Sequence, residues 1–400
     1  MKANKANVVR ALSLVGALAS LAYACVIYPT SLLLPASPDA GPVDNCAHAA
    51  LPGALLDGSV PPDLPDAASL SLVFAMSDLR VDTSDTVHAS GLGPVQAFDL
   101  DGVCACDGIV ACQGGLGAQC NPGGANNAFG PLVNKLFTDT DDNYWIKVGQ
   151  DTSLLTVDGY NGTPNDSQVS VRYYASLGLR GYVLPEAGVP SAPKFDGTDE
   201  WTVEPGSTVL GDAGIGRACD PQGASILPCP ALAGNQDVNA FVRDGVVYFR
   251  PIGPLRFELP IDVQRELFVQ TSDVIGFAKI DRSDRGIWRL TSGTLTGRIP
   301  LDTLLLSMAQ APNLLAGAPA PSRKPAVCED QGTWNLLRDF VCAQRDLSAS
   351  PANDKNPSVP CNAMSFSARF QAVTAKIGRV YQPKRPDTCP AGFVPGTCPQ

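Results

Sequence analysis

Short apolar runs separated by turn-forming residues fill most of this 400-residue chain from Ser69 onward. The run at 168–174 alternates apolar with polar side chains, which is the period of a strand with one buried and one solvated face. Asp greatly outnumbers Glu, and together with 38 Gly and 35 Pro this composition favours tight turns over helices. The sequence therefore predicts a mainly β protein, an antiparallel β-sandwich or jelly roll with a few short helices.

The best expected hairpin is 239–250, where Asp244-Gly245 supplies the two left-handed positions of a tight turn. A second spans 153–175 and is closed by the loop 159–166. Helical spacing predicts helices over 301–310, 333–345 and 132–137, packed at one end of the sandwich. The expected strands are 70–76, 144–148, 153–157, 168–174, 201–203, 238–243, 246–250, 255–259, 267–271, 274–280, 287–290 and 363–373.

Residues 1–24 have the layout of a bacterial export signal, that is, a signal peptide. A basic segment precedes an apolar run from Ala11 to Ala22, and Ala-Tyr-Ala stands before Cys25. Three fates are open: lipidation of Cys25 after cleavage, plain secretion, or an uncleaved anchor. The count of 13 cysteines favours lipidation, because removing Cys25 leaves an even number for bridging and exported chains seldom keep a free thiol.

The chain divides by composition after the signal. Residues 25–67 are rich in Pro and have few large apolar groups after Leu34, so we expect an extended tether. Residues 68–400 are expected to form one β-rich, disulfide-bonded domain. The stretch 214–235 is interpreted either as an internal boundary or as a disulfide-closed loop between strands.

The remaining cysteines predict a disulfide framework, because an exported chain meets an oxidising compartment. Cys219 is expected to pair with Cys229, and Cys389 with Cys398, since each pair closes a short loop. In the cluster Cys104, Cys106, Cys112 and Cys120, two pairings are open: 104 to 112 with 106 to 120, or 104 to 120 with 106 to 112. That leaves Cys46, Cys328, Cys342 and Cys361, so Cys46 is expected to bridge to the C-terminal region.

Two acidic loops are candidate calcium sites, because a hard cation binds carboxylate and amide oxygens held on a stiff turn. The alternative for both loops is that these oxygens accept hydrogen bonds from nearby backbone amides. The candidate ligands are Asp99 and Asp101 in the first loop, and Asp158, Asn161, Asn165 and Asp166 in the second.

Aromatic residues beside acids offer a second kind of site. Tyr160 and Trp201 could stack on the apolar face of a sugar while neighbouring Asp or Asn side chains bind its hydroxyl groups, or they could simply fill the core. With only two histidines, zinc sites and Ser-His-Asp catalysis are disfavoured. A net charge of −10 without a basic cluster disfavours nucleic acid as a partner.

Several segments together resemble uncharacterised exported lipoproteins of GC-rich Gram-negative bacteria. The resemblance covers about Leu70 to Val380 and supplies no activity or catalytic residue. The segments that carry it are the lipobox-like start, 98–102 before a cysteine cluster, 123–127, 160–162 with 165–166, and the terminal cysteines around Phe366.

The sequence thus predicts a lipoprotein of the outer membrane, held through a lipid on Cys25, or an extracellular protein. Its expected role is binding or structural, with a glycan or a protein as ligand and calcium as an optional cofactor. An exported hydrolase that uses carboxylates on polysaccharide is the first alternative. An envelope scaffold without a small ligand is the second.

Overall fold

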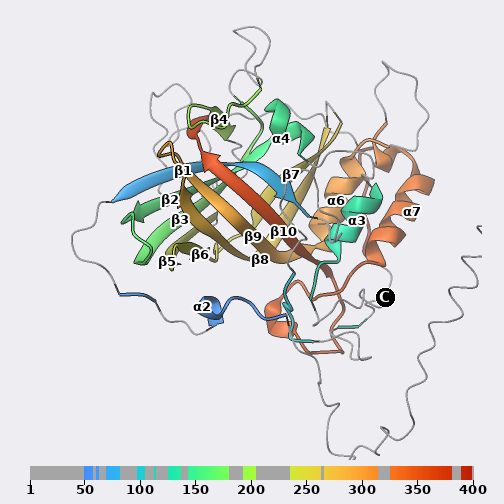
Figure 1. The fold of residues 1–400 in the computed structure, drawn as a ribbon. Coiled ribbons are helices and arrows are strands. Elements are labelled where there is room, and N and C mark those ends of the chain that lie inside the picture. The colour runs from blue at the N-terminus through green and yellow to red at the C-terminus, as the bar shows by residue number, and fades with distance from the viewer. Residues whose placement is uncertain are drawn as a thin grey trace, which may run out of the picture. The chain divides into compact units, whose positions relative to one another are not determined.

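In this computed structural model, nine strands form one antiparallel sheet in the order β6-β5-β3-β2-β1-β10-β9-β8-β7. β6 also pairs with β8, so the strands from β6 round to β8 close into a barrel, and β7 pairs only with the first part of β8 (Figure 1). The strands are β1 (Leu70–Arg80), β2 (Thr152–Tyr160), β3 (Asp166–Ser176), β5 (Gln236–Arg243), β6 (Val246–Phe249), β7 (Leu255–Asp262), β8 (Arg265–Arg282), β9 (Trp288–Pro300) and β10 (Ala363–Thr374). A separate parallel pair is formed by β4 (Glu200–Val203) and β11 (Lys376–Val380).

The structure describes residues 49–56, 60–62, 69–81, 97–103, 112–113, 125–136, 143–179, 192–203, 235–262, 265–313, 325–380 and 389–398, all within one compact unit, Cys46–Gln400. Several expectations fall outside the described residues: the signal, most of the tether, the boundary at 214–235, and Cys25, Cys46, Cys104, Cys106, Cys120, Cys219 and Cys229.

The two expected hairpins are confirmed. In β5–β6, Arg243 pairs with Val246 around Asp244-Gly245, and both turn residues have positive φ, 52° and 77°. This is the backbone that a two-residue hairpin turn requires and that Asp and Gly tolerate best. In β2–β3, Ser153 pairs with Ala175, as the alternating pattern predicts.

The closed barrel differs from the expected sandwich, in which two sheets would face each other. The difference arises in β8, where the two expected strands 267–271 and 274–280 are one strand of 18 residues. The pairing of β8 with β9 shifts register between Ser272 and Ile275, and Asp273 there has a φ of 50°. Such a bulge bends a strand, which lets the first part of β8 pair with β7 and the second part with β6.

The interior of the barrel is packed with apolar side chains from alternate positions of the strands. In β1, Leu72, Phe74 and Met76 belong to this core, whereas Ala75 belongs to a second cluster on the outer face. Gly276 allows a close approach, since a Cβ built there would lie 2.2 Å from the ring of Phe249. The barrel interior is therefore a filled core and not the place to look for a ligand.

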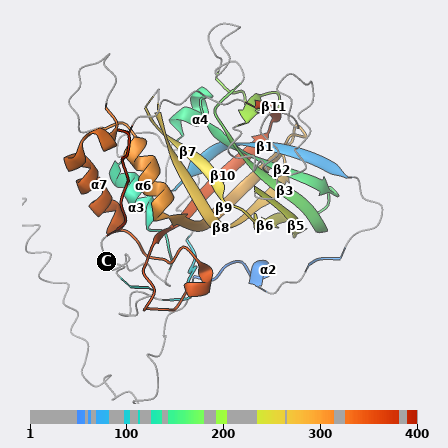
Figure 2. The ribbon, with the colours of Figure 1, turned by 180° about the vertical axis from the view of Figure 1, so that it is seen from behind.

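Helices pack together at one end of the barrel, as expected, and both views show α3, α6 and α7 side by side (Figures 1 and 2). Phe129 of α3 lies edge-on to Phe257 and Phe366, with ring centroids 6.4 and 6.3 Å apart, so this helix extends the barrel core. The helical elements are α2 (Gly53–Leu56), α3 (Phe129–Leu136), α4 (Tyr144–Val148), α6 (Leu301–Gln310), α7 (Gln331–Cys342) and the short 3₁₀ turns Val327–Glu329 and Pro351–Asn353.

Residues 144–148 form helix α4, so the strand expected there was wrong. Five residues are too few for periodicity to separate the two structures. Local contacts decide it: Asn143 accepts a hydrogen bond from the amide of Leu79, and Gly149, with a φ of 80°, ends the helix in the left-handed region.

The three described disulfides are Cys112–Cys361, Cys328–Cys389 and Cys342–Cys398. The expected bridge between Cys389 and Cys398 was therefore wrong, and so were both partners offered for Cys112. The cysteines offered as partners of Cys46 are each bonded elsewhere, which removes the expected bridge from Cys46 to them. Short sequence separation misleads here because residues 389–398 pair with the segments at the two ends of α7 instead of with each other.

Candidate functional site

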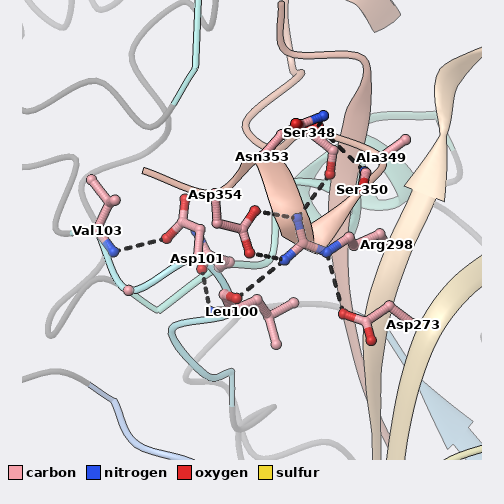
Figure 3. A network of polar contacts seen from close by, with 12 residues as sticks. Leu100, Asp101, Val103, Asp273, Arg298, Ser348, Ala349, Ser350, Asn353 and Asp354 are labelled. Carbon is pink, nitrogen blue, oxygen red and sulfur yellow. Dashed lines mark hydrogen bonds and ion pairs between the residues drawn. The ribbon is translucent and has the colours of Figure 1, made fainter. Parts of the chain in front are cut away.

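Arg298 of β9 is fully buried and joins three segments that lie far apart in the sequence (Figure 3). Its guanidinium forms a two-pronged ion pair with Asp354, with N–O distances of 2.8 and 2.6 Å. It also donates to the backbone carbonyls of Ser348 (2.8 Å) and Leu100 (3.2 Å), and Nε donates to Asp273 at 3.4 Å. All the N–H groups of this side chain are thus used, which is how a buried arginine avoids a large desolvation cost.

Ser348 and Asp354, which Arg298 contacts, belong to the loop 345–362, hereafter the clamp loop. A second buried polar contact, made by Asp346, holds this loop on the barrel. Asp346 accepts hydrogen bonds from the amide and the hydroxyl of Ser365 on β10, at 2.7 and 2.5 Å. Burial raises the pKa of Asp346 to about 6, although the bonds from Ser365 and the charge of Arg298 act to lower it. Asn362 adds a link within the loop, because its side-chain oxygen accepts from the amide of Ala349 at 2.7 Å.

The first candidate calcium loop belongs to this polar network. Asp99 accepts from the amides of Gly102 (2.7 Å) and Val103 (3.2 Å), and Asp101 accepts from Val103 at 3.0 Å. Asp101 is only 4% exposed. These carboxylates therefore stiffen the turn that presents the carbonyl of Leu100 to Arg298, the local backbone role that Asp often takes in turns.

The pKa of Asp101 is raised to about 8, mainly by burial and also by a hydrogen bond with Asp99 and the nearby charges of Asp99 and Asp346, against the lowering effect of the Val103 amide. The folded protein then keeps a proton that the unfolded chain releases above about pH 4, so Asp101 reduces stability progressively between about pH 4 and pH 8. We expect Asp101→Asn to remove this loss, so that the stability of the variant relative to the parent protein rises by about 1.4 kcal/mol for each pH unit between about pH 5 and pH 7.

Urea unfolding of both proteins across this pH range measures the effect. Asp284→Asn, in the exposed turn between β8 and β9, is the matched control for replacing a single Asp by Asn. Equal pH slopes for Asp101→Asn and the parent protein would show that Asp101 is ionised in the folded state.

The second candidate calcium loop also uses its oxygens internally. Asp166 accepts from the amides of Asn161 (2.7 Å) and Gln168 (3.2 Å), and the side chain of Asn165 accepts from the amide of Asp244 at 3.0 Å. Asn161 accepts from the amide of Thr163, and Asp158 accepts from the hydroxyls of Ser71 and Thr156. Among the described residues, no group of three or more His, Cys, Asp or Glu is arranged to hold a metal ion.

The two aromatic candidates are buried. Tyr160 packs edge-on against Trp288 in the barrel core, and its hydroxyl donates to the carbonyl of Thr163. Trp201 is completely buried against Phe195 in the outer cluster, where its indole N–H has no hydrogen-bond partner among the described residues. Neither ring lies on a face that could stack on a sugar.

A cavity of about 430 Å³ lies where the start of α6 meets the clamp loop and residues 396–398. Its wall is mainly apolar, with Leu301, Leu305 and Ala349, and contains a few polar groups, among them Arg345. Cys361 and Cys398 also line it, so two disulfides cross-link its wall. A mainly apolar, pre-formed cavity of this size with a few polar groups is the usual form of a small-molecule site.

Sequence reasoning missed the residues that build this region: Arg298, Arg345, Asp346 and Asp354. None of them belongs to a local sequence motif, and the strand expected at 287–290 ended before Arg298. The available signal was the single charged residue in the otherwise uncharged run 290–300. A charge in such a run is costly to bury unless it is paired, so it marks a partner elsewhere in the chain.

Comparison with known proteins adds no assignment. No protein-family model matches the chain, and no curated protein or solved structure is detectably similar to it. None of the helices in the described ranges has the length and apolar character needed to cross a membrane. Functional conclusions therefore rest on the geometry of the site.

Proposed function

We propose that this protein is an exported binding module that takes a small ligand in the cavity between α6, the clamp loop and residues 396–398. The observation that carries the proposal is the pre-formed cavity itself, whose wall is cross-linked by Cys112–Cys361 and Cys342–Cys398. Binding to a rigid site loses less free energy to ordering than binding to a mobile one. The bonds of Arg298 and Asp346 support this rigidity, because they fix the clamp loop on β9 and β10.

Glycan stacking and calcium are not part of the proposal, because the rings of Tyr160 and Trp201 are buried and the candidate oxygens already accept hydrogen bonds from the protein. The carboxylate hydrolase is also less well supported. Glycosidases place two carboxyl groups about 5–10 Å apart across the substrate, whereas Asp99 and Asp101 are hydrogen-bonded to each other and Asp101 is buried.

Export and lipidation belong to the same proposal. The three disulfides among the described residues fit a protein that matures in an oxidising compartment, and the N-terminal segment ends in Ala-Tyr-Ala before Cys25. A lipid on Cys25 would place the module at the outer membrane, in keeping with the resemblance to exported lipoproteins.

We expect mature protein extracted from membranes to begin at Cys25 and to carry a diacylglycerol-sized mass increment there. Mass spectrometry of the N-terminal peptide measures it, and Cys25→Ser should abolish the increment and release the protein from the membrane fraction. A mature N-terminus at Cys25 without the increment would instead establish plain secretion.

The binding proposal is tested by a ligand-observed NMR screen of small fragments against the full chain. We expect fragments that bind the parent protein to lose binding in Ala349→Phe, because the added ring occupies the cavity. Ala352→Phe is the matched control, since Ala352 is exposed in the same loop and does not line the cavity. Fragments unaffected by Ala349→Phe would contradict the proposed site, and the absence of any bound fragment would favour an envelope scaffold.

A further inference from the structure

The lining of the cavity indicates the chemistry of its ligand. Leu301 and Leu305 of α6, with Ala349 of the clamp loop, form an apolar wall, and no described lining residue is aromatic. Flat stacking of a sugar is therefore not available at this wall, whereas an aliphatic group would be removed from water there.

Arg345 is the one cationic side chain among the described residues that line the cavity. It is only 8% exposed and stands beside Asp346, whose bonds to Ser365 fix this part of the clamp loop. An arginine has five N–H donors in a planar fork, so it can hold a carboxylate while keeping its other partners. In a largely desolvated position such a pair is stronger than at a free surface.

The first turn of α6 adds to the positive character of the same wall. The helix has 10 residues, and its N-cap residue Pro300 makes no side-chain cap bond, so the positive end of the helix dipole lies at the cavity rim, where the carboxylate of Asp302 accepts from one first-turn amide. Asp302 lies at this rim as well, but it is exposed and its carboxylate accepts from the amide of Thr303 at 2.8 Å. Its charge is therefore screened by water more effectively than that of the buried Arg345.

We propose that the cavity binds a small carboxylic acid with an aliphatic body, its carboxylate held by Arg345 and its chain against Leu301, Leu305 and Ala349. This inference rests on the proposed function, because it names the ligand class of the same cavity. Arg345 favours a ligand with a negative charge, and the apolar wall favours a ligand with a hydrocarbon body.

Isothermal titration calorimetry of the full chain with octanoate, octan-1-ol and octylamine tests the inference. We expect octanoate to bind at least tenfold more tightly than octan-1-ol, and octylamine to bind more weakly than either. Arg345→Met should weaken octanoate binding at least tenfold and leave octan-1-ol binding unchanged, while Arg345→Lys should retain part of the preference. Arg338→Met is the matched control, because Arg338 pairs with Asp339 on α7 and does not line the cavity.

Equal affinities for octanoate and octan-1-ol, or octanoate binding that Arg345→Met leaves unchanged, would overturn the inference. If both ligands bind equally and Ala349→Phe removes both, the cavity remains the binding site and only the ligand class is wrong. If bound octanoate is insensitive to Ala349→Phe, the proposed function and the inference both fail. Circular dichroism of each variant confirms that the fold is retained.

Discussion

Replacing Arg298 with methionine is expected to lower the free energy of unfolding by about 3–5 kcal/mol, because a buried ion pair loses one partner. Asp354 would keep a carboxylate without its two-pronged partner, and the carbonyls of Leu100 and Ser348 would lose their shared donor. Urea unfolding measures the stability. Hydrogen exchange should also become faster in residues 97–103 and 345–354, the two segments that Arg298 holds on β9.

Arg289→Met is the matched control for this prediction. Arg289 also lies on β9 and pairs with Asp281 at 2.7 Å, but the two side chains are 44% and 36% exposed. Exposed ion pairs contribute about 1 kcal/mol or less to stability, so the free energy of unfolding of this variant should be close to that of the parent protein. If Arg298→Met were no more destabilising than Arg289→Met, the network would not be what holds the clamp loop.

Removing the bridge Cys112–Cys361 by replacing both cysteines with alanine is expected to lower the free energy of unfolding by about 3–5 kcal/mol. Urea unfolding measures this loss as well. The two cysteines are 249 residues apart, so the bridge restricts the unfolded chain strongly in the chain-entropy model. The bridge also fixes part of the cavity wall, because Cys361 lines the cavity. We therefore expect fragment binding to weaken together with stability.

The double alanine variant at Cys328 and Cys389 is the comparison, since that bridge spans only 61 residues. The free energy of unfolding should fall by about 1 kcal/mol less in this variant than in the variant without Cys112–Cys361, because the entropic cost of closing a loop grows slowly with loop length. Non-reducing peptide mapping supplies an independent check. A peptide that joins Cys112 to Cys104 or Cys106 would contradict the bridge on which this prediction rests.

Local patterns predicted the elements well. The alternation in 168–174 marks a strand because β3 has one face in the core, and Asp244-Gly245 marks a turn because few other residue pairs tolerate two positive φ angles. The expected helix 301–310 coincides with α6, whose apolar residues follow helical spacing. In each case the physical cause acts over a few neighbouring residues.

Long-range features were not predictable in the same way. A sandwich and a barrel both need one buried face per strand, so alternation in β6 and β8 does not show that these strands pair with each other. The predicted disulfide pairings were wrong for the same reason, since the partner of Cys112 is Cys361, 249 residues further along the chain. Buried charges such as Arg298 and Arg345 carry no local motif, and only the folded chain shows what they contact.

The cavity between α6, the clamp loop and residues 396–398 is proposed to take a ligand. The most direct measurement is a crystal structure of the full chain soaked with the fragments that bind in the NMR screen. We expect fragment density in the cavity, in contact with Leu305, Arg345 and Ala349. Fragment density found only elsewhere on the protein, with this cavity empty, would contradict the claim.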